Sequence, residues 1–408
     1  MSNLHLTFVS FKKDSYIVVE GKQNADRFFI IRDGKVRISK SLEVVAEERG
    51  NILGPGDFFG VISTMSSHSH IETAQAVTDV TLISVLKDQY SQLIQNNTPV
   101  AMKIILEFSK RLRYLDEHLS RLTLNDTAEI NPSHLFNVAE YYIRQSKYNE
   151  AYYAYQKYMK NCPQGNNVNT ARERMMKIAP YVKDTAQDRP PDSLTRVYPK
   201  DSMLFAESEP GEELYIIQKG SVKIAKIADN REILLAVLKA GDIFGEMALL
   251  ESKPRAASAI AYEDCEVLAV NHANFVRMIS TQPQMIARLT TLLAERIWFI
   301  YKQLANTLIN DPIGRMYDAL HIQLEKNRIP LLAKTPYTFD FGPKELANMV
   351  GLEQKDANLI LRKMLENQNI RINVDKIHAI NVMEIVKQTE FYRKMQKIED
   401  TRKKNTDN

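Results

Sequence analysis

Short apolar runs that alternate with glycine turns fill two separate stretches of the chain. In the second stretch the runs Ser221–Lys226, Ile233–Lys239 and Cys265–Val270 are rich in β-branched residues, and glycines punctuate the segments around them. Strands of this length at such close spacing are typical of a small antiparallel barrel. We therefore expect a β-roll here.

The two stretches are copies of one module. Lys13-Asp14-Ser15 near the start recurs as Lys200-Asp201-Ser202. Further along, Gly56-Asp57-Phe58-Phe59-Gly60 matches Gly241-Asp242-Ile243-Phe244-Gly245. Since the separation changes so little from one pair to the next, the pattern predicts one domain used twice.

A helix with an apolar stripe is expected after each copy. The stripes have the three-and-four spacing of a helix seam, with Arg111, Arg113, Asp116 and Glu117 off the first stripe. Both helices should pack against another helix, either in a second chain or in the other repeat. The stripe positions are Ile105, Phe108, Leu112, Leu115, Leu119 and Leu122 in the first helix, and Ile286, Leu289, Leu293, Ile297, Ile300, Leu304 and Leu308 in the second.

The segment between the copies has a different character. The spacing from Leu135 through Ala139, Ala151 and Tyr158 to Pro163 fits one tetratricopeptide-like helical hairpin. A single such repeat cannot bury its own faces, so it must pack on neighbouring helices or on a barrel. Residues 184–193, with two adjacent prolines, are expected to form a linker.

The last part of the chain predicts a helix–turn–helix followed by a hairpin. Pro343–Val350, the Gly351 turn and a helix through Glu366 come first, and Ile370–Val374 and Ile377–Ile380 then alternate as two short strands. This order is a winged-helix pattern.

Composition narrows the class of protein without deciding it. Apolar residues make up 44% of the 408 residues, charged residues 25%, and the formal net charge is +4. These values are ordinary for a globular chain. The small net charge does not indicate a nucleic-acid or membrane partner that binds over the whole surface. Two cysteines exclude a disulfide framework and a four-cysteine metal site. With no signal peptide and no long apolar span, we expect a cytoplasmic protein that needs no cofactor and binds no metal.

The strongest chemical signal is the segment Phe244–Ala259. A strand that ends at Gly245 and a short helix after it would present unpaired backbone N–H groups to an anion. Pro254 would direct Arg255 back to the same place, and a guanidinium holds paired phosphate oxygens well. Glu246 accepts hydrogen bonds from hydroxyl groups but repels phosphate, whereas Ser258 adds a donor. The alternative is that Glu246 and Arg255 form an ion pair that braces the barrel rim.

This segment resembles the phosphate-binding cassette of cyclic nucleotide-binding domains. The resemblance implies that Glu246 binds the ribose 2′-hydroxyl, that Arg255 binds the cyclic phosphate, and that Gly245 and Ser258 lie at the phosphate. Alanine at position 256 resembles cassettes that favour cAMP over cGMP. The expected ligand-binding set is Phe244, Gly245, Glu246, Met247, Ala248, Arg255, Ala256, Ser258 and, on the following helix, Tyr301.

The first copy departs from the cassette pattern. Aligned on Phe59-Gly60, it has Val61 at the glutamate position and His70 at the arginine position. Valine cannot accept a hydroxyl hydrogen bond, and a histidine with an ordinary pKa is mostly neutral at pH 7. We expect the first copy to be degenerate, with a structural or dimerising role.

The order of roll, long helix and helix–turn–helix resembles the catabolite activator (Crp/Fnr) family of transcription regulators. Leu293–Ile297, Asp311–Arg315, Glu345–Ala347, Val350–Leu352 and Met364–Ile370 carry this resemblance, which spans about residues 194–385. It implies a cyclic nucleotide, preferably cAMP, that gates a DNA-binding domain. The expected fold is α+β and multidomain, with two cyclic nucleotide-binding β-rolls, a helical hairpin between them and a C-terminal winged helix-turn-helix.

The DNA-reading helix should start near Glu353, and its candidate DNA contacts are Lys344, Gln354, Lys355, Asn358 and Arg362. Residues 311–390 hold 11 basic and 11 acidic side chains, so DNA binding requires that the basic ones cluster. The alternative is a nucleotide-responsive interaction protein that does not touch DNA and binds a protein partner at the tyrosine-rich hairpin. No motif of an enzyme is found. A homodimer and an internal pseudo-dimer both remain open.

The expected domains follow from these patterns. They are a degenerate roll with its helix at 1–125, a helical region at 126–183, a linker at 184–193, a nucleotide-binding roll with its long helix at 194–310, a winged helix at 311–390 and a flexible basic tail at 391–408.

Overall fold

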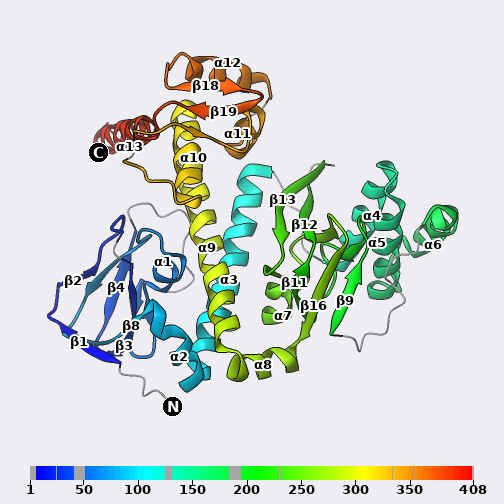
Figure 1. Ribbon diagram of the computed structural model, residues 1–408, viewed down its shortest axis with the longest axis horizontal. Coiled ribbons are helices and arrows are strands. Elements are labelled where there is room, and N and C mark those ends of the chain that lie inside the picture. Colours follow the sequence, from blue (N-terminus) through cyan, green and yellow to red (C-terminus); the bar gives the residue numbers. More distant parts are fainter. Residues whose placement is uncertain are drawn as a thin grey trace. The chain divides into compact units, whose positions relative to one another are not determined.

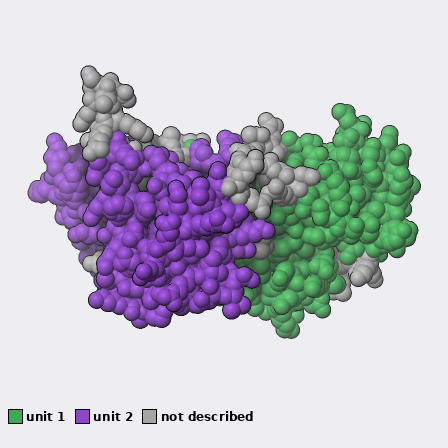
Figure 2. All heavy atoms as spheres, turned by 90° about the horizontal axis from the view of Figure 1, so that it is seen from above, with its two compact units in different colours: residues 1–5, 88–114, 125–293 green, residues 6–87, 115–124, 294–408 purple. Residues whose placement is uncertain are grey.

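The computed structural model describes residues 6–23, 25–40, 51–124, 131–182, 194–228, 231–332, 334–352 and 354–406. The predicted linker 184–193 lies outside these ranges. By their internal packing the residues group into two compact units, coloured separately in Figure 2. Within the described ranges, unit 1 comprises the residues of 88–114 and 131–293, and unit 2 comprises those of 6–87, 115–124 and 294–406.

Unit 2 contains the first β-roll. Its two antiparallel sheets have the orders β1-β8-β3-β6 and β2-β7-β4-β5, and a short helix, α1, follows β6. The roll interior is apolar, with Val36, Ala74 and Leu82 fully buried. Its elements are β1 (Thr7–Phe11), β2 (Tyr16–Val18), β3 (Arg27–Asp33), β4 (Val36–Ser39), β5 (Ile52–Leu53), β6 (Phe58–Phe59), α1 (Val61–Ser66), β7 (Thr73–Ala76) and β8 (Val80–Leu86).

Unit 1 contains the second β-roll, which repeats the first strand for strand. Its sheets have the orders β9-β16-β11-β14 and β10-β15-β12-β13. Even the register recurs, since Tyr215 pairs with Ala269 as Phe29 pairs with Ser84. The duplication predicted from the sequence is confirmed. The elements are β9 (Thr195–Tyr198), β10 (Met203–Phe205), β11 (Glu213–Lys219), β12 (Ser221–Ala228), β13 (Arg231–Lys239), β14 (Ile243–Phe244), α7 (Glu246–Glu251), β15 (Ser258–Ala261) and β16 (Cys265–Asn271).

Each roll is followed by a short helix and then a long one. These are α2 (Tyr90–Asn96) with α3 (Thr98–Leu124), and α8 (His272–Thr281) with α9 (Pro283–Thr307). The apolar stripes are buried, except that Leu119 is half-buried and that Leu122 and Leu308 are exposed at the helix ends. Each long helix is divided between the units. Residues 98–114 of α3 pack in unit 1, with the second roll, and residues 294–307 of α9 pack in unit 2, with the first.

Helices α4 (Leu135–Arg144), α5 (Tyr148–Asn161) and α6 (Val168–Ile178) form the expected helical insert (Figure 1). Fully buried Ala139 and Ala151 lie in the core where α4 and α5 meet. The same core includes Met203 and Ile260 from β10 and β15, so the hairpin is packed onto the second roll.

The described residues of the C-terminal part of unit 2 form four helices and a small sheet. They are α10 (Pro312–Lys326), α11 (Pro343–Met349), α12 (Gln354–Leu365) and α13 (Val382–Thr406), with strands β17 (Tyr337–Thr338), β18 (Ile370–Asn373) and β19 (Lys376–Ala379) in the order β17-β19-β18. Gly351, with a φ of 67°, turns the chain between α11 and α12. These helices and strands match the elements expected for this region.

The segment expected to be a flexible tail differs from that expectation. Residues 391–406 continue α13 as a helix. Arg393 Nε donates to Asp318 Oδ1 at 2.9 Å, and Asp318 is buried in α10. The backbone N–H of Asn310 donates to the Gln396 side chain at 3.0 Å. These contacts anchor the start of the segment, and its basic composition alone does not reveal them. Among the described residues, no helix combines the length and apolarity needed to cross a bilayer.

Candidate functional site: two cassettes with different chemistry

The second cassette is built as its sequence predicts. Strand β14 ends at Phe244, Gly245 turns the chain with a φ of 76°, and α7 begins at Glu246. A side chain at position 245 would be strained by this φ and would also meet Arg255 Nη1, 2.7 Å from the added Cβ. Glycine is therefore required here for backbone geometry and for space.

The polar cassette residues are buried. Glu246 is 2% exposed, Arg255 4% and Ser258 0%. Ser258 Oγ accepts the backbone N–H of Glu207 at 2.9 Å, which joins β15 to the segment after β10. Met247 and Ala248 lie in α7 and are buried, and Ala256 is half-buried. The structure thus brings together every predicted ligand residue of the second cassette.

Arg255 is held by carbonyl oxygens and aromatic rings. Its Nη1 donates to Gly245 O at 2.6 Å and its Nη2 to Glu213 O at 2.7 Å. The guanidinium carbon lies 4.2 Å from the centre of the Phe205 ring. Both hydrogen bonds of the guanidinium thus go to main-chain oxygens, whereas the alternative interpretation expects an ion pair with Glu246.

Two buried polar atoms in this part of the cassette lack a hydrogen-bond partner among the described residues. One is Nε of Arg255 itself, and the other is Oγ of Ser208. Gly211 lies against the guanidinium, since a Cβ added there would come within 2.3 Å of Nε. A buried donor without a partner is costly, so the guanidinium retains an unused N–H for an external acceptor.

Aromatic residues around the cassette were not among the sequence candidates. The rings of Phe205, Tyr215 and the predicted Phe244 pack against one another, with ring-centre distances of 5.4 to 5.9 Å. Burial raises the pKa of Tyr215 well above its ordinary value, so its hydroxyl stays protonated. Phe205 and Tyr215 lie in apolar strands whose sequence pattern predicts only core residues. Their contact with Arg255 therefore could not be predicted from the neighbouring sequence.

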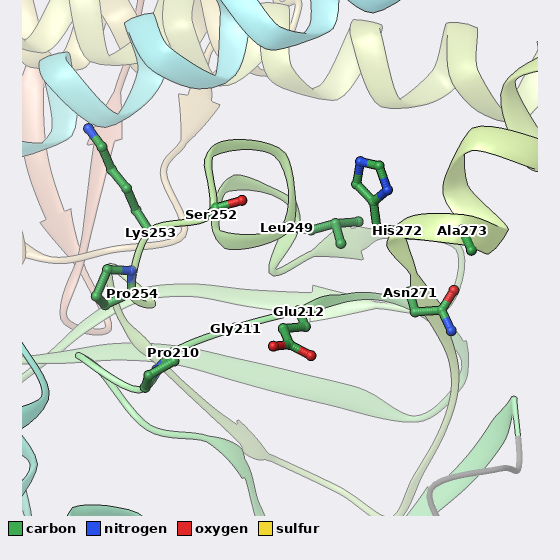
Figure 3. Close-up of a pocket in the computed structure, with 10 residues that line it drawn as sticks. All are labelled: Pro210, Gly211, Glu212, Leu249, Ser252, Lys253, Pro254, Asn271, His272 and Ala273. Carbon is green, nitrogen blue, oxygen red and sulfur yellow. The ribbon is translucent and has the colours of Figure 1, made fainter. Parts of the chain in front are cut away.

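An open hollow of about 560 Å³ lies next to the cassette (Figure 3). The Pro210–Glu212 loop, the Ser252–Pro254 loop and the start of α8 line it, and neither Glu246 nor Arg255 does. Gly211 and Pro254 border the hollow and adjoin Arg255. The hollow is therefore a neighbour of the predicted phosphate site and is distinct from it.

The first cassette has the same backbone but different chemistry. Gly60 has a φ of 78° and α1 has six residues, as α7 does. Val61 and His70 are buried where the second cassette has Glu246 and Arg255. Here the Gly60 backbone N–H donates to Glu72 Oε1 at 3.3 Å. The counterpart of Glu72 in the second copy is Ala257. A carboxylate of the chain itself thus reaches the amide at the start of α1.

The long helix of each repeat contacts the cassette of the other repeat. In unit 1, Arg113 of α3 donates from Nε to Glu251 Oε2 at 2.9 Å and from Nη1 to Pro254 O at 3.2 Å. In unit 2, Trp298 Nε1 of α9 donates to Ser69 O at 3.3 Å. Arg113 and Trp298 are 185 residues apart, as are Ser69 and Pro254, so equivalent donors meet equivalent carbonyls.

Tyr301 is the one ligand candidate that the structure places with the other unit. It packs in unit 2, where Lys40 Nζ lies 5.3 Å from the centre of its ring. Its expected contact with the nucleotide base stays a prediction.

The DNA-binding candidates lie on two helices. Lys344 is exposed on α11, and Asn358 and Arg362 are exposed one turn apart on α12. The opposite side of α12 packs into the core through Ala357 and Met364. Gln354 and Lys355 belong to the first turn of α12, but their side chains lie outside the described residues.

The comparisons with known proteins agree with the duplicated fold. A family model described as the cyclic nucleotide-binding domain matches residues 8–97 and again residues 195–282. The cAMP-activated global transcriptional regulator CRP of Salmonella typhimurium is 31% identical over 175 residues, which are 42% of this chain and 82% of that protein. The chain belongs to the cyclic nucleotide-binding domain family, carries the domain twice and is distantly similar to the CRP/FNR transcription regulators.

Two further relatives show the same partial overlap. The CRP-like cAMP-activated global transcriptional regulator of Mycobacterium tuberculosis is 29% identical over 176 residues, covering 43% of this chain and 79% of that protein. The solved structure of the Thermus thermophilus catabolite activator protein is 25% identical and covers 48% of this chain and 90% of that one, with a TM-score of 0.28. At that score the structural likeness by itself supports no functional argument.

Proposed function

We propose that the protein is a sensor of a cyclic nucleotide, preferably cAMP, which binds in the second cassette and regulates transcription through the C-terminal domain. The observation that carries the ligand proposal is the buried Arg255 guanidinium, whose Nε has no hydrogen-bond partner among the described residues and lies against Gly211. The resemblance to the cassette and the cAMP-activated relatives support the choice of ligand.

In this proposal each cassette residue has a role. Arg255 binds the cyclic phosphate with Gly245 and Ser258, and Glu246 accepts the ribose 2′-hydroxyl. Phe244, Met247, Ala248 and Ala256 form the walls around the ligand. The Arg255 guanidinium donates to two carbonyl groups in this structure, and on ligand binding it would replace some of these hydrogen bonds with hydrogen bonds to the phosphate. The cassette would then have different contacts in its free and bound states.

The experiment is a calorimetric titration of the full chain with cAMP and with cGMP. Arg255→Ala should abolish measurable binding because it removes the phosphate contact. Glu246→Gln should weaken binding because a neutral amide oxygen accepts the 2′-hydroxyl less strongly than a carboxylate does. His70→Gln, at the equivalent position of the first cassette, is the matched control and should bind as the wild type does. Undiminished affinity in Arg255→Ala would defeat the assignment.

We further propose that the first cassette binds no nucleotide. Val61 and His70 replace the two proposed ligand-binding side chains, and a Glu72 side-chain oxygen occupies the amide that would otherwise meet a phosphate. The first roll then has a structural role and supplies α3, whose Arg113 supports the second cassette.

The crossed contacts of Arg113 and Trp298 support an internal pseudo-dimer. Each cassette finds within this chain the helix residue that touches it, so a second chain is not needed to provide one. Light scattering should give the mass of one chain, with and without cAMP. A mass of two chains would favour the homodimer.

The C-terminal domain is proposed to be a winged helix that reads DNA with α12. Asn358 and Arg362 project from the exposed face of α12, and Lys344 of α11 is exposed for a phosphate contact. The test is the retention of the full chain on duplex DNA over a range of salt concentrations, with cAMP present. Arg362→Gln should weaken retention, whereas Lys160→Gln, which changes an exposed lysine of α5, should not. No retention even at low salt would favour an interaction protein that leaves DNA alone.

The tyrosines of the hairpin give little support to that second candidate. Tyr141, Tyr142, Tyr153, Tyr155 and Tyr158 are all buried in the core that α4 and α5 share with the second roll. They therefore hold the hairpin in place and are not available as a binding surface.

A further inference from the structure

The loop between β10 and β11 holds the backbone of Arg255. The Arg255 N–H donates to Glu209 O at 2.8 Å, and the Ser208 N–H donates to Arg255 O at 2.9 Å. Pro210 and Pro254 form a β-bridge beside this pair. The position of the arginine main chain therefore depends directly on the position of this loop.

The side chain of Glu209 is bound by the helical hairpin. The Tyr153 hydroxyl of α5 lies 2.9 Å from Leu204 O and 3.0 Å from Glu209 Oε2, so its single O–H faces both acceptors. Lys157, one turn later, places Nζ 2.7 Å from Glu209 Oε1. The Ala206 N–H also donates to Oε2, at 3.0 Å. Glu209 is 7% exposed, so this carboxylate depends on these donors in place of water.

The environments of the Tyr153 hydroxyl and the Lys157 ammonium group favour their contacts with the Glu209 carboxylate. Tyr153 is buried, and burial together with the nearby Glu209 charge raises the pKa of its hydroxyl, so the hydroxyl remains a donor. Lys157 Nζ lies 4.8 Å from the centre of the Tyr153 ring and 2.7 Å from the carboxylate. Of the two, Lys157 remains partly open to solvent, with 26% of its side chain exposed.

We propose that Tyr153 and Lys157 are positioning residues for Arg255, so that the helical hairpin sets the nucleotide affinity of the second roll. The chain of contacts is short: α5 holds the Glu209 side chain, and the Glu209 main chain holds Arg255. A change at the hairpin moves the loop and with it the guanidinium. This inference rests on the proposed binding of a cyclic nucleotide by Arg255.

The test is a titration of the full chain with cAMP. Tyr153→Phe keeps the ring but removes the hydroxyl, and we expect about a fivefold to tenfold loss of affinity. Lys157→Met should lower affinity about threefold, and Lys157→Arg should restore most of it. Lys160→Met, an exposed lysine on the same helix, is the matched control and should change nothing.

Two measurements separate positioning from a general loss of stability. Tyr153→Phe combined with Arg255→Lys should cost less affinity than the two single losses together, because both act on one contact. In the nucleotide-free chain, Tyr153→Phe should speed amide hydrogen exchange in peptides covering 206–211 and 254–258. Faster exchange across the whole chain would instead indicate general destabilisation and would overturn the proposal.

The outcomes also distinguish this inference from the proposed function. If the wild type binds cAMP, Arg255→Ala does not and Tyr153→Phe binds as tightly as the wild type, the positioning role is wrong and the binding site stands. If the wild type binds neither cAMP nor cGMP, the binding site and the positioning role both fall.

Discussion

Arg113 is predicted to be the main link between α3 and the second cassette. It is 3% exposed, and the Glu251 side chain that it meets is 2% exposed. Ser109 Oγ donates to the other oxygen of Glu251 at 2.7 Å. Arg113→Met leaves this carboxylate buried without its main cation, which is the situation in which breaking an ion pair is most costly.

The expected magnitude follows from these contacts. Loss of one partner of a buried ion pair costs about 3 to 5 kcal/mol. The only other cation near Glu251 in the described part of the chain is Lys253, at 3.8 Å and with 60% of its side chain exposed, so water screens it strongly. We therefore expect Arg113→Met to destabilise the α7 region by about 3 kcal/mol.

The assay must report locally, because a chain with several domains does not unfold in one two-state step. Native-state hydrogen exchange of peptides that cover α7 gives the local opening free energy. Lys253→Met is the control and should change it by less than about 0.5 kcal/mol. Arg113→Met with Glu251→Leu should cost much less than the sum of the two single changes, because it removes both charges. A loss below about 1 kcal/mol in Arg113→Met, or additive single losses, would refute the role of the ion pair.

Three further predictions follow from other parts of the structure. The triple variant Val61→Glu, His70→Arg and Glu72→Ala should give the first cassette the side chains of the second and raise the cAMP stoichiometry towards two per chain. A stoichiometry that stays at one would show that other residues also distinguish the two copies. Burial lowers the pKa of His321 in the folded chain, so the unfolded chain binds the proton at a higher pH and stability should fall as pH drops below about 6.5. His321→Gln should reduce this loss of stability at acid pH in thermal melts. An unchanged dependence of stability on pH would contradict the prediction. Gly211→Ala should weaken cAMP binding, because the new Cβ would stand 2.3 Å from the Arg255 Nε, and unaltered affinity would show that the arginine has room to move.

The sequence predicted most of the fold because the information is local and repeated. Strand alternation, glycine turns and an almost constant offset identified both rolls, and Gly245, Glu246 and Arg255 identified one cassette. The helical insert, the C-terminal helices and the small sheet were also expected. Each of these signals lies within a few residues of the element it specifies.

The contacts that were missed join distant parts of the chain. Arg113 lies off the apolar stripe of α3 and was expected on a polar face, yet it is buried against Glu251. Its equivalence with Trp298 in the second copy was the available clue. Glu72 and Glu209 gave no local signal, because the role of each carboxylate depends on a partner supplied by the fold.

A calorimetric count of cAMP bound per intact chain shows whether the second cassette is the nucleotide site. With a functional second cassette and a degenerate first one, we expect a stoichiometry of one, with the binding heat lost in Arg255→Ala and kept in His70→Gln. A chain that takes up no cyclic nucleotide, or one that still binds it without the Arg255 guanidinium, would disprove this assignment.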